Sequence, residues 1–407
     1  MVGKHGKIKL VHMTTIPESL VFTKGQIACM KSRGFEVHLI SSPGEYLRDF
    51  AAQEQVDYCS VKMPRRITPM QDLVAILHLY RELRRIRPTI MHSHTPKGGL
   101  IGTMTAWLAR VPVRVYHIHG LPFITATGLK RKLLRLSERV SCRLATQVLC
   151  VSNSVSHVAV SEGFCPLSKI KVLGLGSING IDAVGMFNPV TVGKPARIET
   201  RMKYSIPQDA IVLGFVGRMV RDKGLMELVG AWKVLREEHD NLYLLMVGDY
   251  ESHDPVSPEI EQILRSDERI RITGEVSYVP PFYAAMDLLT LPTYREGFPL
   301  VPMEAASMGL PVVATQVTGC VDAVKNGITG TLVPPGDSKA LAEAIRKYIN
   351  DPELRQCHGQ AGRKRMLCDF RQEDIWEATF REYQHLLDKA GVLANTQKRP
   401  NPTEARK

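Results

Sequence analysis

The 407-residue sequence has few aromatic residues and no long apolar run. Aromatic side chains make up only 6% of it, and no basic stretch is interleaved with them, which argues against a nucleic-acid-binding protein. No segment reaches the roughly 18 consecutive apolar residues of a membrane span. The N-terminus passes from a basic segment straight into a short apolar strand, so we expect a chain that is neither secreted nor integral to a membrane.

Metal-binding and disulfide patterns are also missing. The eight cysteines are scattered, with no Cys-x-x-Cys pair and no Cys/His group at the spacing of a metal site. This distribution indicates neither a disulfide framework nor a structural zinc, and it favours a reducing, cytoplasmic setting.

The positive charge is concentrated in one half of the chain. The net charge is +12, yet residues 1–190 hold 25 Lys/Arg against 11 Asp/Glu, and residues 191–407 hold 28 against 30. Such asymmetry indicates that the first half meets a polyanion, either nucleic acid or an anionic membrane surface. The alternative is a solubilising charge without a partner.

Short β-rich runs alternate with helix-length stretches in the first half of the chain, which predicts a parallel, doubly wound α/β sheet. The expected strands are 7–13, 35–41, 89–93, 113–118 and 147–151, and the expected helices include 70–86, 98–109 and 128–144.

A second alternation follows a Gly/Pro-containing stretch without periodicity, 183–205, where we place the domain boundary. Its expected strands are 211–217, 242–247, 269–274, 287–291 and 311–315, and its expected helices are 225–239, 280–286, 299–308 and 338–349. The sequence therefore predicts two Rossmann-like domains, 1–190 and 191–370, facing a cleft. A helix at 371–390 that crosses back to the first domain and a disordered tail at 391–407 complete the prediction.

Two cations stand where a strand passes into a helix. Gly217 and Arg218 follow the strand, and Lys223 and Gly224 precede the helix. Two charges five residues apart, beside a helix N-terminus, can hold a diphosphate. An exposed loop with two solvated cations is the alternative.

Two carboxylates stand eight residues apart in the string REGFPLVPME. Glu296 falls in a loop after a strand, whereas Glu304 falls inside a helix that Pro299 opens. One acid could bind sugar hydroxyls and the other the hydroxyls of a ribose, while the backbone of Phe298 faces an anion. A surface loop acid and a solvated helix acid are the alternatives.

These strings together resemble a known family. GFVGRMVRDKG, LMVGD, the stretch from DLLTLP to PVVAT, and NGITGTLVPPGD follow one another as in the C-terminal domain of the retaining family-4 glycosyltransferases, which have the GT-B fold. Glu296 and Glu304 match the E-x7-E motif of that family, and Arg218 and Lys223 match its phosphate-binding pair. The element Asn179-Gly180-Ile181-Asp182 resembles the NGVD that precedes the interdomain linker.

The resemblance implies roles for these residues. Arg218 and Lys223, beside Gly217, would neutralise the diphosphate of a nucleotide sugar, UDP-sugar above all, and Glu304 would bind its ribose. Glu296 would contact the transferred sugar, and the backbone of Phe298, Pro299 and Leu300 would line the donor pocket. No metal or other cofactor would be required, because cations already stand where Mg²⁺ would, and the sequence holds no Asp-x-Asp.

The N-terminal half resembles the family more loosely. His119-Gly120 is similar to its active-site histidine, which implies a catalytic role beside the donor sugar. His94, Lys97 and Gly98, in HSHTPKGG, are expected on the acceptor side. One departure is clear: Thr14-Thr15 stands where many members have a Gly-Gly loop.

HSHTPKGGLIG and YHIHGLPF also resemble the bacterial members that build glycans on undecaprenyl diphosphate. The implied acceptor is a lipid-linked saccharide, and the implied location is the inner face of the plasma membrane. Segment 128–143 agrees with a location at the membrane surface. Its apolar residues Leu129, Leu133, Leu136 and Val140 recur at helical spacing among basic residues, as in a helix that lies on an anionic leaflet. A packed helix with a solvated basic face is the alternative. The expected membrane contacts are Lys130, Arg131, Arg135 and Arg139.

Other functions fit the sequence less well. A GT-B sugar-nucleotide epimerase or phosphorylase would share the architecture but not this E-x7-E context. A nucleic-acid-binding protein would use the basic half but lacks a recognised motif. A dinucleotide-dependent oxidoreductase fails because Gly174-x-Gly176-x-x-Asn179 is an incomplete fingerprint.

Overall fold

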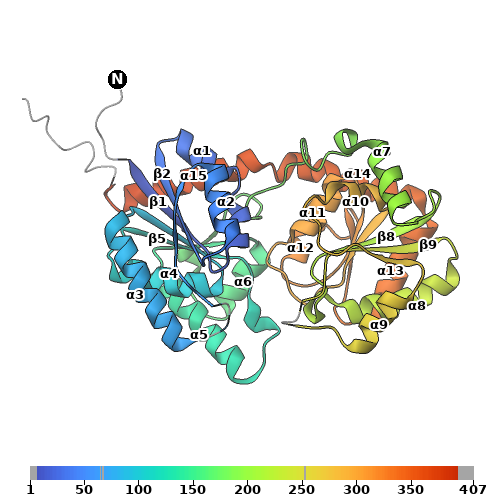
Figure 1. The fold of residues 1–407 in the computed structure, drawn as a ribbon, viewed down its shortest axis with the longest axis horizontal. Helices are drawn as coiled ribbons and strands as arrows, with labels where there is room; N and C mark the ends of the chain where they lie inside the picture. Colours follow the sequence, from blue (N-terminus) through green and yellow to red (C-terminus); the bar gives the residue numbers. More distant parts are fainter. Residues whose placement is uncertain (1–6, 65, 67, 252–253, 393–407) are drawn as a thin grey trace, which may run out of the picture.

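The computed structural model describes residues 7–64, 66, 68–251 and 254–392. It has two α/β lobes, each built on a parallel sheet (Figure 1), which confirms the predicted fold class. The strands of the N-terminal sheet, in spatial order, are β3 (Asp57–Ser60), β2 (Phe35–Ser41), β1 (Ile8–Met13), β4 (Ile90–His94), β5 (Val113–Ile118), β6 (Gln147–Cys150) and β7 (Ile170–Val172). Those of the C-terminal sheet are β10 (Ile270–Ile272), β9 (Leu242–Val247), β8 (Ile211–Val216), β11 (Leu288–Leu291), β12 (Val312–Thr315) and β13 (Gly330–Val333).

Helices connect the strands of both sheets. Those of the N-terminal lobe are η1 (Pro17–Thr23), α1 (Gln26–Ser32), α2 (Glu45–Glu54), α3 (Pro69–Ile86), α4 (Pro96–Leu108), η2 (Pro122–Ile124), α5 (Gly128–Leu144), α6 (Asn153–Ser161) and η3 (Leu167–Lys169). The others are α7 (Pro189–Lys203), η4 (Arg221–Lys223), α8 (Leu225–Glu238), α9 (Pro258–Ser266), α10 (Pro280–Ala285), α11 (Leu300–Ser307), α12 (Cys320–Ala323), α13 (Ser338–Asn350), α14 (Pro352–Asp369) and α15 (Gln372–Lys389).

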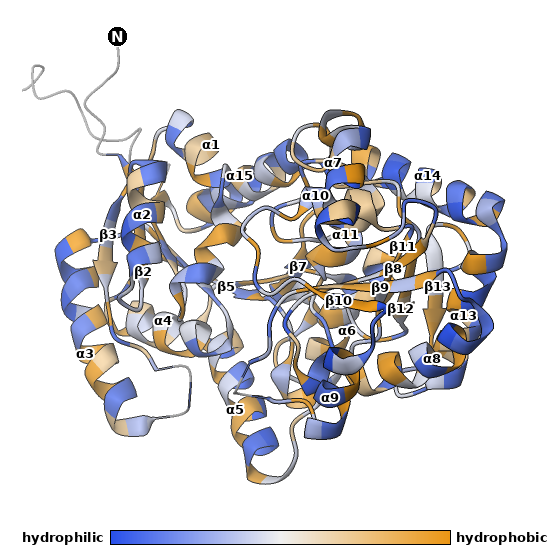
Figure 2. Ribbon diagram, turned by 45° about the vertical axis from the view of Figure 1, so that its right-hand side comes forward, coloured by the Kyte–Doolittle hydropathy of each residue, from blue (hydrophilic) through white to orange (hydrophobic). Residues whose placement is uncertain are grey.

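The strands are apolar on both faces because helices cover both. In β8, Val212 and Val216 enter one core cluster, whereas Leu213 and Phe215 enter the cluster on the opposite side. Figure 2 shows the C-terminal strands in hydrophobic colours, surrounded by helices of mixed colour. Side chains alternate across a strand, so each strand supplies both cores, and its polar residues are left for the loops at its ends.

The structure differs from the predicted elements at several places. The stretch 183–205, expected to lack regular structure, contains α7, which Asn188 caps and Pro189 begins. Gly193 interrupts this helix with φ of 74°, and Pro195 follows, so the apolar periodicity is broken. Strands β3, β7 and β13 were also not predicted; each has only three or four residues.

The last helix returns to the first domain. Tyr383, Leu386 and Leu387 of α15 are buried in the N-terminal core. Trp376 donates its indole N–H to Asn179 Oδ1 at 2.7 Å, which attaches the helix to the NGID element. In Figure 1, α14 and α15 run along one side of both lobes. The tail predicted to be disordered lies, from residue 393, outside the described residues.

Candidate active site

The loops that follow the strands of the two sheets meet between the lobes. Lys223, at the end of η4, and Glu296, in the loop after β11, form an ion pair with 2.5 Å between Nζ and Oε1. Both side chains are mostly buried, at 20% and 14% exposure. Two of the predicted donor-site residues therefore lie together, and each neutralises the other.

The second cation lies in a more open environment. Arg218 follows β8 and Gly217, and it donates from Nη1 to Glu251 Oε2 at 2.7 Å. Its side chain is 50% exposed. An exposed ion pair contributes little to stability, so Arg218 can exchange Glu251 for an anionic ligand at small cost.

Glu304 lies within α11, and its carboxylate has a single hydrogen-bond partner among the described side chains. Tyr283 of α10 donates its hydroxyl to Oε2 at 2.6 Å. Burial raises the pKa of Glu304, and the Tyr283 bond opposes that rise. No hydrogen bond or ion pair joins Glu304 to Arg218 or Lys223 within the described ranges.

The start of α11 lies one residue later than predicted. Pro299 is the N-cap, with φ of −71° and ψ of 129°, and Leu300 is the first helical residue. The Phe298 ring is 8% exposed and lies 5.3 Å from the Phe370 ring, centroid to centroid. Since that ring is packed inside the protein, any contact of Phe298 with a ligand has to come from its backbone.

The two lobes touch at a pair of loops. A Cβ atom placed on Gly297 would lie 1.7 Å from the carbonyl oxygen of His119, and one on Gly120 would lie 3.5 Å from Gly297. Ser152, after β6, also donates its hydroxyl to the Gly297 carbonyl oxygen at 2.8 Å. The loop that carries Glu296 is thus pressed against the loop that carries His119.

A side chain at position 297 should separate these loops. We expect Gly297→Ala to lower kcat/KM about 100-fold, because displacing reacting groups by about 1 Å has an effect of that size. Initial rates and thermal unfolding would be measured on the same samples, and unfolding should change little because the contact lies between the lobes. Gly44→Ala is the matched control, since its Cβ would meet only Pro17 at 3.5 Å. Unchanged kcat/KM in Gly297→Ala would contradict the geometry.

Further polar contacts join the lobes on both sides of these loops. Arg295 donates from Nε to Thr125 Oγ1 at 2.8 Å and pairs with Asp222 at 2.8 Å. Asp322 of α12 accepts from the backbone N–H of Asn153 at 3.1 Å and from the Ser154 hydroxyl. The sequence motifs did not predict these residues, because each motif lies within one domain and an interdomain contact needs residues from both.

His119, which is partly exposed, and His94, which is buried, belong to a row of imidazoles. His119 Nε2 lies 3.0 Å from His94 Nδ1, and His94 Nε2 lies 3.0 Å from His12 Nδ1. Burial lowers the pKa of His119 to about 3, and it lowers the pKa of His94 well below its usual value. His119 therefore enters the site as a neutral imidazole that accepts or donates a hydrogen bond, and not as a cation.

The structure gives the surroundings of the residues predicted on the acceptor side. His94 is only 2% exposed and lies beneath His119, because β4 directs alternate side chains to the face that α15 covers. The Lys97 ammonium pairs with Asp72 at 2.6 Å and donates to two backbone carbonyls at 2.5 Å, so its charge is already neutralised. Gly98 packs against Thr15 and Thr95.

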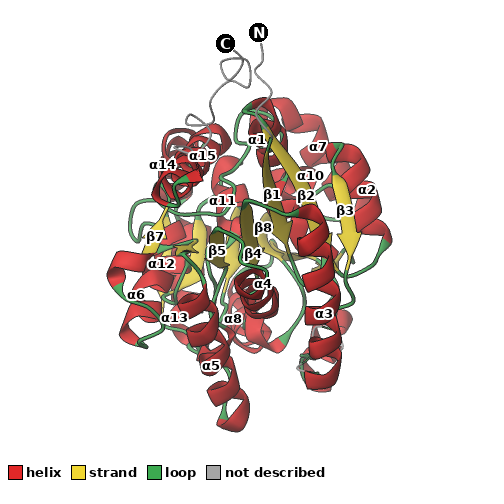
Figure 3. Cartoon of the chain, turned by 90° about the vertical axis from the view of Figure 1, so that its left-hand side faces the viewer, coloured by secondary structure: helices red, strands yellow, loops and turns green. Residues whose placement is uncertain are grey.

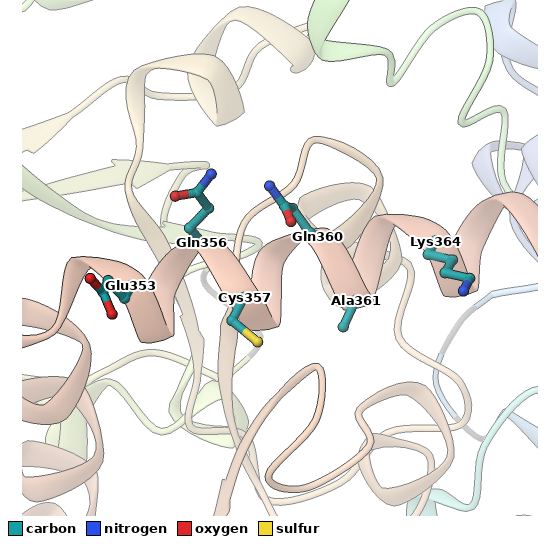
Figure 4. A pocket seen from close by; sticks show the side chains of 6 residues that line it. All are labelled: Glu353, Gln356, Cys357, Gln360, Ala361 and Lys364. Carbon is teal, nitrogen blue, oxygen red and sulfur yellow. The ribbon is translucent and has the colours of Figure 1, made fainter.

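One surface pocket lies away from these loops. The six residues that line it all come from α14 (Figure 4), and none of them was predicted to bind a ligand. They are Glu353, Gln356, Cys357, Gln360, Ala361 and Lys364. A hollow along a single helix brings no cation or acid of the two motifs together, so it is not the candidate site.

Comparisons with known proteins place this geometry in a family. Residues 196–365 match the family described as glycosyl transferases group 1, and residues 21–176 match the glycosyl transferase 4-like domain. A capsular polysaccharide biosynthesis glycosyltransferase, CapM of Staphylococcus aureus, is 34% identical over 94% of this chain and 98% of its own length. The chain belongs to the family-4 (group 1) glycosyltransferases. The predicted family is thereby confirmed.

Other relatives agree with this assignment. An Escherichia coli enzyme, UDP-Gal:α-D-GlcNAc-diphosphoundecaprenol α-1,3-galactosyltransferase, is 25% identical over 87% of this chain and 91% of its own length. Among solved structures, Anabaena HepE in complex with UDP-glucose superposes with a TM-score of 0.77 at 20% identity, covering 93% of this chain and all of that one. A Rickettsia africae glycosyltransferase has the same TM-score and identity and covers 94% of this chain and 99% of its own. The fold is GT-B, and the protein is a glycosyltransferase.

Proposed function

We propose that this glycosyltransferase moves a hexose or N-acetylhexosamine from a UDP-sugar to a lipid-linked saccharide, with retention at the anomeric carbon, in bacterial polysaccharide or glycan biosynthesis. The observation that carries the proposal is the Lys223–Glu296 pair, which faces the His119–Gly120 loop across the junction of the lobes. The Escherichia coli relative, which uses UDP-Gal and a diphosphoundecaprenol acceptor, supports the substrate classes.

Donor binding exchanges the ion-pair partners of Lys223 and Arg218. When the donor binds, its diphosphate replaces Glu296 as the partner of Lys223, and Arg218 exchanges Glu251 for the same group. Glu296 is then free to bind hydroxyls of the transferred sugar, and Glu304, aligned by Tyr283, accepts from the ribose. Both acids are thus held in position before the donor arrives.

We propose the following chemical step. The bond from the anomeric carbon to the diphosphate oxygen breaks, a bond to the acceptor hydroxyl oxygen forms on the same face, and the hydroxyl proton passes to the departing diphosphate. Lys223 and Arg218 stabilise the leaving group, Glu296 stabilises positive charge at the anomeric carbon, and neutral His119 binds a sugar hydroxyl. We propose that no metal cofactor takes part, since these two cations fill that role.

An apolar surface on the N-terminal lobe supports a membrane-bound acceptor. Helices α3, α4 and α5 lie side by side there (Figure 3), and no helix in the described ranges has the length and apolar content to cross a bilayer. Each of these helices carries exposed apolar side chains: Met70, Leu73, Val74 and Leu77 of α3, Trp107 and Leu108 of α4, and Leu129, Leu133 and Leu136 of α5. Lys130, Arg131 and Arg139 of α5 are also exposed, whereas Arg135 is paired with Glu162. The proposed location is the cytoplasmic face of the plasma membrane.

Removing the basic residues of α5 should release the protein from anionic membranes. Each basic residue near such a surface contributes about 1 kcal/mol, so we expect the quadruple change of Lys130, Arg131, Arg135 and Arg139 to Gln to weaken liposome binding by at least about 100-fold. Co-sedimentation with vesicles containing phosphatidylglycerol measures it. The matched control makes the same change at four exposed lysines of the C-terminal lobe: Lys233, Lys339, Lys347 and Lys364. Equal pelleting of both variants would argue against this surface.

The proposed reaction is tested first by ligand stabilisation and then by product analysis. UDP at a hundred times its Kd should add about 2.7 kcal/mol to the free energy of unfolding, whereas NAD and an oligonucleotide should add nothing. Purified protein would then be incubated with UDP-sugars and lipid-linked monosaccharides, and the anomeric configuration of the product determined by NMR. Conversion of a UDP-sugar to its epimer without an acceptor, or an inverted product, would overturn the proposal.

A further inference from the structure

Five histidines, in three adjacent strands or directly after them, lie together beneath the junction of the lobes. The histidine cluster consists of His12, His92, His94, His117 and His119, at the carboxyl ends of β1, β4 and β5. Neighbouring ring centroids lie 4.1–5.8 Å apart. Three of these residues, His94, His117 and His119, each bring one ring nitrogen within 4.8 Å of those of the other two.

We propose that His94, His117 and His119 bind a divalent transition-metal ion of borderline softness, such as Zn²⁺, at the end of the cluster nearest the cleft. Zinc–imidazole bonds of about 2.0–2.1 Å place tetrahedral ligand nitrogens about 3.4 Å apart. His94 Nδ1 and His119 Nε2 are 3.0 Å apart, so the ion replaces a shared proton with a small movement of the rings.

The remaining ring nitrogens are held as they are in metal sites. His94 Nε2 lies 3.0 Å from His12 Nδ1, and His117 Nδ1 lies 3.2 Å from His92 Nε2. His92 is in turn bonded through Nδ1 to the Tyr383 hydroxyl of α15 at 2.5 Å. Such partners fix the orientation of a ligating imidazole, and they assign His94 Nδ1 and His117 Nε2 as the ligand atoms.

The exposure of His119 favours a site at His94, His117 and His119 over a site at a second, inner group of three histidines. His12, His92 and His94 also bring ligand atoms within 4.8 Å of one another, but all three are at most 2% exposed. His119 is partly exposed, so an ion can reach the outer triad from the cleft. Three protein ligands leave a fourth coordination position open.

The ligand chemistry selects the class of ion. All three ligands are imidazoles, with neither carboxylate nor thiolate among them. Imidazole suits zinc, copper, nickel and cobalt, whereas magnesium, calcium and manganese prefer oxygen ligands. The site therefore discriminates against magnesium, calcium and manganese.

An ion bound there should inhibit the enzyme. It takes the ring nitrogen of His119 and draws the imidazole toward His94, away from the donor sugar. This consequence rests on the proposed function, in which His119 contacts that sugar, whereas binding of the ion does not. In this proposal, bound Zn²⁺ acts as an inhibitor.

Metal binding is tested with Co²⁺ on tag-free protein. A His78→Ala background is used because Cys59, His78 and Glu82 form a separate group that could hold an ion. We expect one equivalent of Co²⁺ to bind with visible ligand-field absorption, and Zn²⁺ to displace it. His117→Gln and His94→Gln should each weaken binding about 100-fold or more. His157→Gln, at an exposed residue of α6, is the control and should bind as the background does.

The outcomes separate the site from the proposed function. Stoichiometric Co²⁺ absorption that persists in both Gln variants, or its absence from the background protein, overturns the metal site. Thermal unfolding and stabilisation by UDP would be measured for each variant. His12→Gln keeps the three ligands but alters the partner of His94 Nε2, so it should retain the absorption with an affinity lowered about 10- to 100-fold, which gives a second test if one triad variant misfolds. Loss of turnover with one equivalent of Zn²⁺, restored by EDTA, supports inhibition, and full turnover with bound Zn²⁺ overturns it. If UDP fails to stabilise a protein that still binds Co²⁺, the proposed function is wrong and the metal site is not affected.

Discussion

Glu296→Gln should lower kcat by about 100- to 1,000-fold, the range seen when a group that stabilises charge in a transition state is removed. The substitution keeps the size of the side chain and removes its charge. The Kd for UDP should stay the same or fall, because Lys223 loses the partner that the diphosphate has to displace. Initial rates give kcat, and isothermal titration calorimetry gives the Kd.

The different effects on kcat and on the Kd for UDP distinguish a role in catalysis from a purely structural role. A purely structural role for Glu296 would lower thermal stability and weaken UDP binding together. Glu343→Gln, an exposed carboxylate on α13, is the matched control and should change neither constant. If Glu296→Gln turns over like the unmodified protein, Glu296 has no part in the mechanism.

Lys223→Ala should produce the opposite pattern, with its main effect on donor affinity. It removes a charge-assisted contact to the diphosphate, for which about 1.5–3 kcal/mol is typical, and it leaves the Glu296 carboxylate unpaired beside the phosphates. We therefore expect UDP to bind about 100-fold more weakly. Titration calorimetry measures the change, and Lys233→Ala, an exposed lysine on α8, controls for the altered net charge.

A double-mutant cycle resolves the interaction of the pair. In Lys223→Ala/Glu296→Gln, the repulsion between Glu296 and the phosphates is gone, so the double variant should bind UDP more tightly than Lys223→Ala alone. Additive effects would mean that Lys223 and Glu296 act independently on the donor, contrary to the exchange proposed here.

Much of the C-terminal domain could be read from local signals. Apolar strands alternated with helix-length stretches, and the cations and acids stood in loops directly after strands, where parallel sheets bind ligands. The ion pair between Lys223 and Glu296 joins two such loops, 73 residues apart. Even so, the prediction treated each charge separately, because spacing along the chain does not say which cation faces which acid.

The histidines also show that the sequence does not predict which residues from different strands lie together. The strings HSH and HIH place side chains at alternate positions, so the sequence contained the signal that each pair shares one face of a strand. What it did not contain was the order of strands, which sets β1 beside β4 and β4 beside β5. His94 was consequently expected at the acceptor side, although it is buried beneath His119.

By itself, the sequence determined the family, the parallel α/β architecture and the residue types of the donor site, because each depends on local patterns of hydrophobicity, glycine and charge. The tertiary structure decided the contacts: which acid neutralises which cation, how closely Gly297 approaches His119, and how α15 completes the first domain. These contacts join residues far apart in the chain, and their distances follow from the packing of two lobes, which no local pattern encodes.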